Sequence, residues 1–579
     1  MSETEQRGPS RRDLLRSGGV LAGAAVAAPF AATGAAQAHG NGNGHGTSPA
    51  GDLILTNGEI HTMDRRDTVV SVVAIRDGEV VYAGDRESAA RKEFGDKPRI
   101  VDLRGRTAVP GIIDCHNHIV LMGNRPGYHT PLENAYSVSD VQSTIRSRSR
   151  TAPTGKFITT IGGFHFNQFR EARLPTLAEL DAASPRHPVY LSVGFTGPSV
   201  TNSLGKAFFE SVPGPDGPVT VGADGSIASG TQTGRATLAL RRQLTFEDRK
   251  RSTRDAMAYA VGLGVTTHLD QGAFQAADAP SDGAAHEDNF AMHLPFLSVF
   301  GDGDGIIRLR INFLYMDADP ASVALGDRLR NAFPFFGNDL VRTGGIGEFV
   351  APVPSDPITS GSAGNQRWLD AARKVAQAGW RAEVHSLSAT DFKAEIDGFA
   401  LVDAEFPIRD LRWVVAHVPS ITAEYVDKLK ALGGGINVTG YRYFTGTPTA
   451  AGPPYRMLID KGIPLGMSSD GMQIAPMNPW VHTYYATTGV NALGVAINGD
   501  QLATRHEALA GYTRDNGWFL GGVDEDRLGV LAPGRLGDVA VLNRDYFDRR
   551  AVKDADLKKI NSVLTVLGGV VVHDTGAVH

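Results

Sequence analysis

The segment at residues 109–118, which reads VPGIIDCHNH, restricts the possible folds more than any other part of the chain. Its apolar, β-branched residues predict a buried strand, and the Pro-Gly pair marks the start. Side chains alternate across a strand, so Asp114, His116 and His118 are expected on one side and Cys115 on the other. Two imidazoles at this spacing can converge on one metal ion at a strand end, whereas a helix would separate them. The segment therefore predicts a metal-binding strand end, with two unrelated histidines as the alternative.

Strand and helix patterns alternate through the middle of the chain. Seven further buried strands are predicted at residues 264–269, 308–316, 346–350, 380–385, 411–417, 435–439 and 463–467. Helical patterns lie between several of them, most clearly at residues 246–262, 366–378 and 423–432. Repeated strand–helix units favour a parallel sheet, and eight of them favour an α/β fold of the (β/α)₈ TIM-barrel type. A doubly wound sheet is the alternative, but no glycine-rich phosphate-binding motif follows a strand.

The regions before and after this alternating part have a different pattern. Residues 52–109 and 525–579 contain short strand patterns separated by glycine turns, and neither region shows a helical period. They predict one small β-sandwich domain assembled from both termini. The barrel would then occupy residues 110–524, and a long Gly- and Pro-rich interval at about 122–245 predicts a subdomain inserted after the first barrel strand.

The first 38 residues resemble a twin-arginine export signal. Arg11 and Arg12 precede an Ala/Gly/Val-rich run, and Ala36-Gln37-Ala38 then provides a small-residue cleavage site. Residues 39–51 are rich in Gly, Asn and Ser and predict a flexible linker. The resemblance implies recognition by the twin-arginine export machinery, cleavage near Ala38 and a periplasmic or extracellular location. A retained N-terminal anchor is the alternative; after cleavage no stable membrane span is expected.

Charge and cysteine content exclude few classes of protein, but they do limit the partners. The formal net charge of −6 gives no indication of nucleic-acid binding, which needs a basic patch. Cys115 is the only cysteine, so no intramolecular disulfide can form. Its predicted orientation away from the two histidines favours core packing over a nucleophilic role. Nucleic acid is therefore not an expected partner, and a homo-oligomer stays possible.

Polar residues follow or end several of the predicted strands. In a barrel of this kind the site lies at the carboxyl ends of the strands. The residues expected there are His116, His118, His268, Glu348, His385, His417 and Asp470. Imidazoles and carboxylates form the ligand set that suits zinc or a similar divalent ion.

These passages together resemble the amidohydrolase superfamily of metal-dependent hydrolases, in the branch that includes N-substituted formamide deformylase. The matching motifs are PGIIDCHNH at 110–118, EVHS at 383–386, AH at 416–417, MSSDG at 467–471, MNP at 477–479, YT at 512–513 and GVLAPGRLGD at 529–538. The similarity covers nearly everything from Leu53 onward and includes the split β domain. It implies a (β/α)₈ barrel, one or two divalent ions, most plausibly zinc, and hydrolytic activity.

The resemblance also assigns roles to individual residues. His116, His118 and Asp470 are expected to bind a first ion, and His385 and His417 a second. Glu348 stands on the strand where such sites often carry a bridging carboxylated lysine, so it is expected to bridge the two ions. Alternatively, one ion is bound by His116, His118, His385 and Asp470, and His417 polarises the substrate carbonyl.

The expected chemistry follows from these assignments. A divalent ion lowers the pKa of bound water to roughly 7, which supplies hydroxide at neutral pH. Asp470 is the expected general base, and the second ion or His417 would stabilise the oxyanion of the tetrahedral intermediate.

Five further residues are candidates for contact with the substrate. His165 and Asn202 lie in the inserted segment, where the resembling branch has pocket-lining residues. His268 lies at the end of the second predicted strand, and Tyr441 and Arg442 follow the seventh. For each of them an ordinary structural role is the alternative.

The sequence thus predicts an exported, metal-dependent amidohydrolase that acts on a non-peptide C–N bond of an amide, formamide or carbamate-like small molecule. A C–O hydrolase, acting on an ester or lactone, would need the same site. A non-catalytic protein that keeps the fold as a metal- or ligand-binding scaffold is the alternative from another class.

Overall fold

The computed structural model describes residues 51–579, except 95–97, 195, 212–217, 273–291, 318, 320 and 473. The predicted export signal at 1–38 and the predicted linker at 39–51, apart from Gly51, lie outside the described residues. Within the described residues, every helix is too short or too polar to cross a lipid bilayer.

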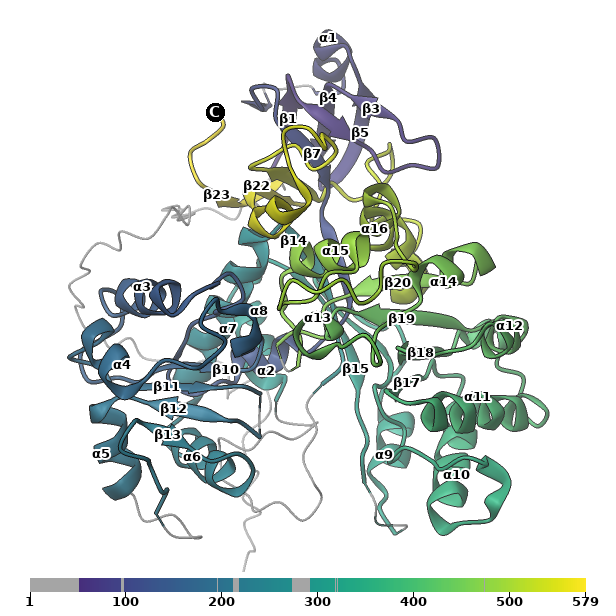
Figure 1. The fold of residues 1–579 in the computed structure, drawn as a ribbon. Coiled ribbons are helices and arrows are strands. Elements are labelled where there is room, and N and C mark those ends of the chain that lie inside the picture. Colours follow the sequence, from purple (N-terminus) through teal and green to yellow (C-terminus); the bar gives the residue numbers. More distant parts are fainter. Residues whose placement is uncertain are drawn as a thin grey trace, which may run out of the picture. The chain divides into compact units, whose positions relative to one another are not determined.

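Eight parallel strands at the centre of the fold form two four-stranded sheets (Figure 1). The first sheet pairs, in this order, β8 (Ile112–Asn117), β14 (Val265–Asp270), β15 (Arg308–Phe313) and β16 (Val341–Ile346). The second pairs β17 (Glu383–Ser386), β18 (Val414–His417), β19 (Gly435–Thr439) and β20 (Leu465–Ser468). The predicted α/β class with parallel strands is confirmed.

Backbone hydrogen bonds join the edges of these two sheets. The amide of Ile346 donates to the carbonyl of Arg381 at 2.9 Å, next to a parallel bridge between Ile346 and Ala382. At the other edges, the amide of Asp470 donates to the carbonyl of His116 at 2.9 Å. The residues that follow β20 therefore lie directly against the end of β8.

The predicted position of the fourth strand, residues 346–350, is wrong. β16 ends at Ile346, so Glu348 lies in the loop two residues beyond it. Strand β16 contains Gly344 and Gly345. Glycine is uncommon in strands, so the sequence of β16 lacks the β-branched pattern that predicts one. The apolar residues that suggested a strand, Phe349 and Val350, are buried in the loop instead.

Helices follow most of the central strands and pack on the outside of the sheets (Figure 1). Helix α7 (Phe246–Gly262) has the bounds that the sequence predicts, because Thr245 and Asp248 form a capping box at its start. The other helices of this part are α2 (Ile119–Gly123), α8 (Leu294–Gly301), α9 (Ala324–Asn331), α10 (Ala363–Gln377), α11 (Ala389–Asp403), α12 (Ala423–Ala431), α13 (Arg442–Thr445), α14 (Tyr455–Lys461), α15 (Pro479–Thr488), α16 (Arg505–Gly511) and α17 (Gly517–Leu520).

The segment after α2 forms a separate five-stranded sheet inside the predicted insertion. Its strands are β9 (Tyr128–His129), β10 (Ile158–Ile161), β11 (Val189–Ser192), β12 (Ser199–Thr201) and β13 (Ser226–Ile227). Its helices are α3 (Val138–Arg148), α4 (Leu177–Ala183), α5 (Ser203–Ser211) and α6 (Thr231–Arg241). Ile145, Ile158 and Leu180 belong to a hydrophobic cluster made only of residues from this segment. The segment therefore has a core of its own.

Residues from both ends of the described part of the chain share one sheet. Its strands, in order, are β23 (Val570–Asp574), β22 (Ser562–Leu567), β21 (Val539–Leu542), β7 (Thr107–Pro110), β2 (Glu59–His61) and β3 (Val69–Val70). A second sheet contains β5 (Glu79–Gly84), β4 (Val72–Arg76), β1 (Leu53–Thr56) and β6 (Arg99–Asp102). Leu55, Val73 and Val541 lie in one hydrophobic cluster that draws on both sheets. Helix α1 (Glu87–Arg91) also lies in this region, where the sequence predicts no helix.

Candidate metal centre

Six predicted ligands converge at the carboxyl ends of the central strands. They are His116 and His118 at the end of β8, Glu348 after β16, His385 in β17, His417 at the end of β18 and Asp470 after β20. All are buried except His385, whose side chain is 19% exposed. Parallel strands bring these positions to one edge because all their carboxyl ends point the same way.

The first group of possible ligands contains His116, His118 and Asp470. Oδ1 of Asp470 lies 3.4 Å from Nε2 of His118 and 3.9 Å from Nε2 of His116. Nδ1 of His116 lies 2.6 Å from a carboxylate oxygen of Glu383, and Nδ1 of His118 lies 2.6 Å from the carbonyl oxygen of Gly272. These hydrogen bonds orient both rings so that Nε2 faces the centre, the arrangement usual for histidine ligands.

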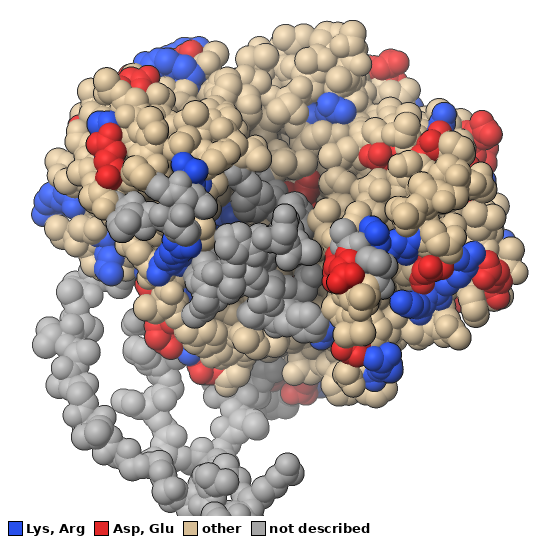
Figure 2. Space-filling view, turned by 90° about the horizontal axis from the view of Figure 1, so that it is seen from below, with Lys and Arg blue, Asp and Glu red and all other residues tan. Residues whose placement is uncertain are grey.

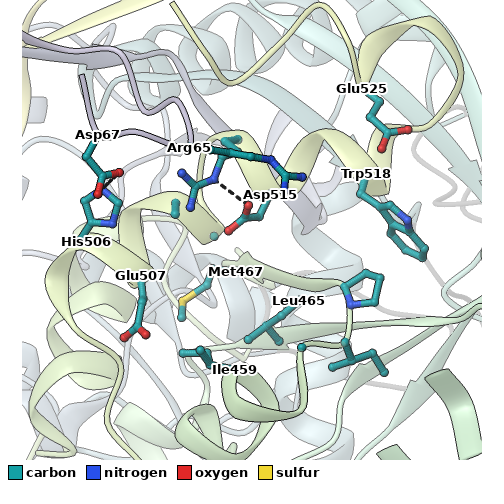
Figure 3. Close-up of a pocket in the computed structure, with 16 residues that line it drawn as sticks. Arg65, Asp67, Ile459, Leu465, Met467, His506, Glu507, Asp515, Trp518 and Glu525 are labelled. Carbon is teal, nitrogen blue, oxygen red and sulfur yellow. Dashed lines mark hydrogen bonds and ion pairs between the residues drawn. The ribbon is translucent and has the colours of Figure 1, made fainter. Parts of the chain in front are cut away.

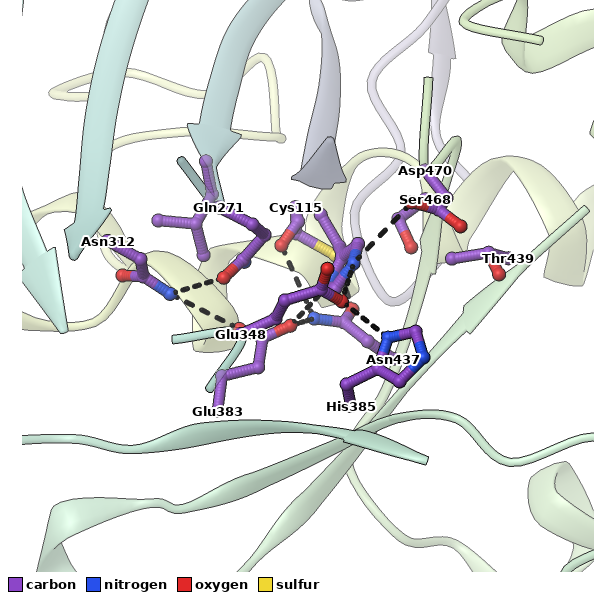
Figure 4. A network of polar contacts seen from close by, with 12 residues as sticks. Cys115, Gln271, Asn312, Glu348, Glu383, His385, Asn437, Thr439, Ser468 and Asp470 are labelled. Atoms are coloured by element: carbon purple, nitrogen blue, oxygen red, sulfur yellow. Dashed lines mark hydrogen bonds and ion pairs between the residues drawn. The ribbon is translucent and has the colours of Figure 1, made fainter. Parts of the chain in front are cut away.

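Glu348 contacts all four imidazoles of the cluster. Oε1 lies 3.3 Å from Nε2 of His118, and Oε2 lies 3.3 Å from Nε2 of His116. Oε2 also lies 2.9 Å from Nδ1 of His385, as Figure 4 shows, and 3.2 Å from Nε2 of His417. Burial opposes the charge on Glu348, but the imidazoles around it, led by His385, hold the pKa of Glu348 well below its usual range. Its carboxylate thus lies between the two predicted ligand groups.

The carboxylates of the cluster affect the pKa values of the imidazoles unequally. Burial lowers the pKa of His116, but the carboxylates of Glu348 and Glu383 raise that pKa to about 10. Burial likewise opposes protonation of His118, but Asp470 and Glu348 raise the pKa of His118 well above its usual range. At His417 burial dominates and lowers the pKa.

The donor atoms fit a divalent ion. Nε2 of His116 and Oδ2 of Asp470 are buried and have no hydrogen-bond partner within the described residues. A tetrahedral ion with bonds of about 2.0–2.2 Å holds its ligand atoms about 3.3–3.6 Å apart. Three of the nitrogen–oxygen separations around His116 and His118 are 3.3, 3.3 and 3.4 Å. Nitrogen and oxygen donors in this number are the ligand set of zinc and related ions.

Two residues that support the centre were not predicted from the sequence. Glu383, in β17, accepts from Nδ2 of Asn437 at 2.8 Å as well as contacting His116 (Figure 4). Oγ1 of Thr439, in β19, lies 2.9 Å from Nδ1 of His417. Glu383 is two residues before His385 in the EVHS motif, so strand alternation was the available signal for it.

Asp114 ties β8 to the segment that carries Asp470. Its carboxylate accepts hydrogen bonds from the backbone amide of Ser469, at 3.0 Å, and from the hydroxyl of Ser469. Burial raises the pKa of Asp114 to about 6 despite these hydrogen bonds. Ser469 is next to Asp470, so this pair holds the predicted base in place.

Tyr441, Arg442 and His165 all lie in or against the short helix α13. The ring of Tyr441 is 6.2 Å from that of His417 and nearly perpendicular to it. His165 caps the short helix at Phe166–Gln168, and its ring is 6.4 Å from that of Phe444, in α13. The three candidates therefore belong to one contiguous region, formed by the insertion and the segment after β19.

Two of the predicted substrate contacts have different surroundings from those expected. Asn202 lies in the insertion, where its side chain accepts from the amides of Val189 and Gly205 and donates to the carbonyls of Ser184 and His187. These bonds engage both the oxygen and the nitrogen of the side-chain amide, which gives Asn202 a structural role.

His268 does not end its strand as predicted, because β14 continues to Asp270. Burial lowers the pKa of His268 to about 3, and neither ring nitrogen has a hydrogen-bond partner among the described residues.

A separate cavity of about 780 Å³ is shown in Figure 3. Its lining includes Leu465, the first residue of β20, whereas Asp470 follows the last residue of that strand. None of the six candidate ligands lines it. His506 and Asp67 pair across it at 2.7 Å, and Arg514 pairs with Asp515 at 2.9 Å. The cavity is therefore distinct from the metal centre.

Imidazoles and carboxylates gathered at the carboxyl ends of parallel strands define a metal-binding α/β protein. The chain belongs to the amidohydrolase family, whose family model matches residues 99–573. N-substituted formamide deformylase from Arthrobacter pascens is 30% identical over 141 residues, which are 24% of this chain and 26% of that relative. Protein LONG AFTER FAR-RED 3 from Arabidopsis thaliana is 30% identical over 239 residues, 39% of this chain and 40% of that relative. The chain thus matches less than half the length of these curated relatives.

Among solved structures, an uncharacterized metal-dependent hydrolase from Pyrococcus horikoshii OT3 has the same fold. The TM-score is 0.58 at 19% identity, and the match covers 87% of this chain and 99% of that one. The amidohydrolase relationship predicted from the sequence is confirmed, and the match covers the eight central strands, the insertion and, of the terminal sheets, β6, β7 and β21–β23.

Proposed function

We propose that this protein is a metal-dependent hydrolase of a non-peptide C–N bond in an amide, formamide or carbamate-like small molecule. The observation that carries the proposal is the contact of one carboxylate, Glu348, with four imidazoles beside the carboxylate of Asp470. The name of the Arthrobacter pascens relative, a formamide deformylase, supports the C–N bond as the target.

His116, His118 and Asp470 would hold one ion, and His385 and His417 a second, with Glu348 between them. The contacts of Glu348 with both groups support two ions over one. A divalent ion, when bound, supplies a water of lowered pKa, roughly 7, and polarises the substrate. Zinc is the ion we propose, because the donors are imidazole nitrogens and carboxylate oxygens.

Asp470 is the proposed general base. Its Oδ2 is buried without a hydrogen-bond partner in the described part of the chain, so it can accept a proton from the attacking water. As the C–N bond breaks, Asp470 returns the proton to the leaving nitrogen. The water oxygen ends in the acid product, and the nitrogen leaves as an amine.

We further propose that the eight central strands form a closed (β/α)₈ barrel over residues 110–524. The backbone bonds between β16 and β17 and between β8 and the residues after β20 support closure. The shared cluster between the two terminal sheets supports a β-sandwich domain from residues 52–109 and 525–579.

The proposed substrate is small and is not a nucleic acid. On the face shown in Figure 2, basic side chains are interspersed with acidic ones, and most of the surface is uncharged.

The paired Arg11 and Arg12 with the Ala36-Gln37-Ala38 site support export through the twin-arginine machinery. Replacing both arginines by lysine should keep the precursor inside the cell, as fractionation and immunoblotting would show.

The test of the function uses mature protein purified without chelator. Elemental analysis should find near two divalent ions per chain, and a panel of N-substituted formamides, amides and carbamates should include a substrate. Turnover restricted to esters or lactones would move the target to a C–O bond. Bound metal without any turnover on the panel would favour the scaffold role.

A further inference from the structure

Tyr441 has a buried hydroxyl next to the side chain of Arg442. The residue follows β19 by two positions, and its side chain is 7% exposed. Its hydroxyl oxygen is buried and has no hydrogen-bond partner among the described residues. A buried polar group without a partner destabilises the folded state, because it has lost its hydrogen bonds to water. Such a group in a native fold calls for a partner, and a ligand bound at the metal centre is one.

The surroundings of Tyr441 place it beside the proposed chemistry. Its ring meets that of His417 edge to face, with centroids 6.2 Å apart and an interplanar angle of 86°. A tyrosine phenol has an ordinary pKa of about 10 and is protonated at neutral pH, so the Tyr441 hydroxyl can donate a hydrogen bond there.

Three ring nitrogens of the neighbouring imidazoles already contact other side chains. Nδ1 of His417 faces Thr439 at 2.9 Å, and its Nε2 lies 3.2 Å from Glu348. Nδ1 of His385 lies 2.9 Å from Glu348. With His417 as a metal ligand, as these contacts favour, its ring is not available to the substrate oxygen, and a further hydrogen-bond donor can act there beside the ion.

Arg442 supports the same assignment. Its guanidinium lies 4.9 Å from the centroid of the Tyr441 ring, and no carboxylate of the described residues forms an ion pair with it. A cation over the ring face draws electron density from the phenol and makes its hydroxyl a better donor. Arg442 is thus a positioning residue for Tyr441.

We propose that the hydroxyl of Tyr441 donates a hydrogen bond to the carbonyl oxygen of the substrate and stabilises the oxyanion that forms there. The inference rests on the proposed function. As the water oxygen bonds to the carbonyl carbon, the π-electron pair of the C=O bond moves to the carbonyl oxygen. The hydroxyl of Tyr441 donates its hydrogen bond to that oxygen. When the C–N bond breaks, that pair reforms C=O, and Tyr441 has neither gained nor lost a proton.

The test compares Tyr441→Phe with wild type, both loaded with zinc. Removing one oxyanion donor lowers kcat about 10²–10³-fold in known cases. We expect a loss of that size, a change in KM of less than tenfold and an unchanged zinc content. The melting temperature should hold or rise, because the variant removes a hydroxyl that has no partner.

Tyr485→Phe is the matched control. Its hydroxyl donates to the carbonyl of Gly452 at 2.8 Å, so its loss should lower the melting temperature and leave kcat within a few-fold of wild type. Wild-type kcat in Tyr441→Phe would overturn the proposal, and so would loss of zinc or of stability, which would make Tyr441 a structural residue. If wild type itself hydrolyses nothing, the proposed function fails first, and the catalytic role of Tyr441 falls with it.

Discussion

Nδ1 of His116 lies 2.6 Å from Oε1 of Glu383, and both side chains are fully buried. This contact leaves Nε2 of His116 facing Glu348 at 3.3 Å. A carboxylate behind a ligating imidazole fixes the orientation of the ring and increases its basicity. Glu383 therefore acts on the centre through His116 and needs no contact with an ion.

We predict that Glu383→Gln weakens zinc binding without unfolding the protein. Loss of such a supporting carboxylate typically lowers metal affinity about 10–100-fold. Competition with a chelating dye measures the affinity, and Glu405→Gln, which removes an exposed carboxylate paired with Arg373, is the control. Equal affinities in Glu383→Gln and wild type would show that the His116 ring is held by other contacts.

Glu348→Gln should change the number of bound ions. The amide keeps the shape of Glu348 but loses the charge that allows one carboxylate to serve two cations. We expect the metal content to fall from near two ions per chain to one or fewer, as elemental analysis after dialysis would show. Two ions retained by this variant would exclude Glu348 as a bridging ligand.

Asp470→Asn should remove turnover and spare the fold. An amide cannot accept the proton of the attacking water, and loss of a general base costs about 10²–10⁴-fold in rate. The measurement is kcat at saturating metal, with circular dichroism as the check on folding. A variant that keeps wild-type turnover would remove Asp470 from the role of base.

The candidate ligands could be listed from the sequence because their positions coincide with strand ends. His116, His118, His385, His417 and Asp470 follow or end buried strands, and parallel strands bring such positions to one edge. The helix at 246–262 was predicted at both bounds because its capping residues are local in sequence. Capping interactions of this kind join residues close together in sequence, so they do not depend on the tertiary structure.

The parts that the sequence did not predict depend on long-range contacts. Thr439 points inward from β19, and nothing near it in sequence distinguishes an inward polar residue from a solvent-facing one. Asn202 lies in a segment where the resembling branch has pocket-lining residues. Its hydrogen-bond partners, the carbonyls of Ser184 and His187, come from another part of the insertion. Only the tertiary structure separates its structural role from a binding role.

Glu133 links the insertion to the segment after Asp470. Its carboxylate accepts from the hydroxyl of Tyr259 at 2.6 Å, from the amide of Asn478 at 3.0 Å and from the amide of Met477. Burial raises the pKa of Glu133 to about 7, against these hydrogen bonds, and the charge of Asp114 adds to the rise. The other titratable group facing it is Tyr136.

The raised pKa of Glu133 makes stability depend on pH in a definite direction. A carboxyl group whose pKa is higher in the folded state stabilises that state at low pH. Its contribution is fully present below the unfolded pKa of 4.5 and is lost as the pH rises through about 7. Relative to Glu133→Gln, which has no such proton, wild type should therefore lose stability between pH 5 and pH 8. Each pKa unit corresponds to about 1.4 kcal/mol, so the loss should be of the order of 3 kcal/mol. Chemical unfolding of both proteins across this range measures it, and parallel curves would mean that Glu133 has the same pKa in the folded and unfolded chains.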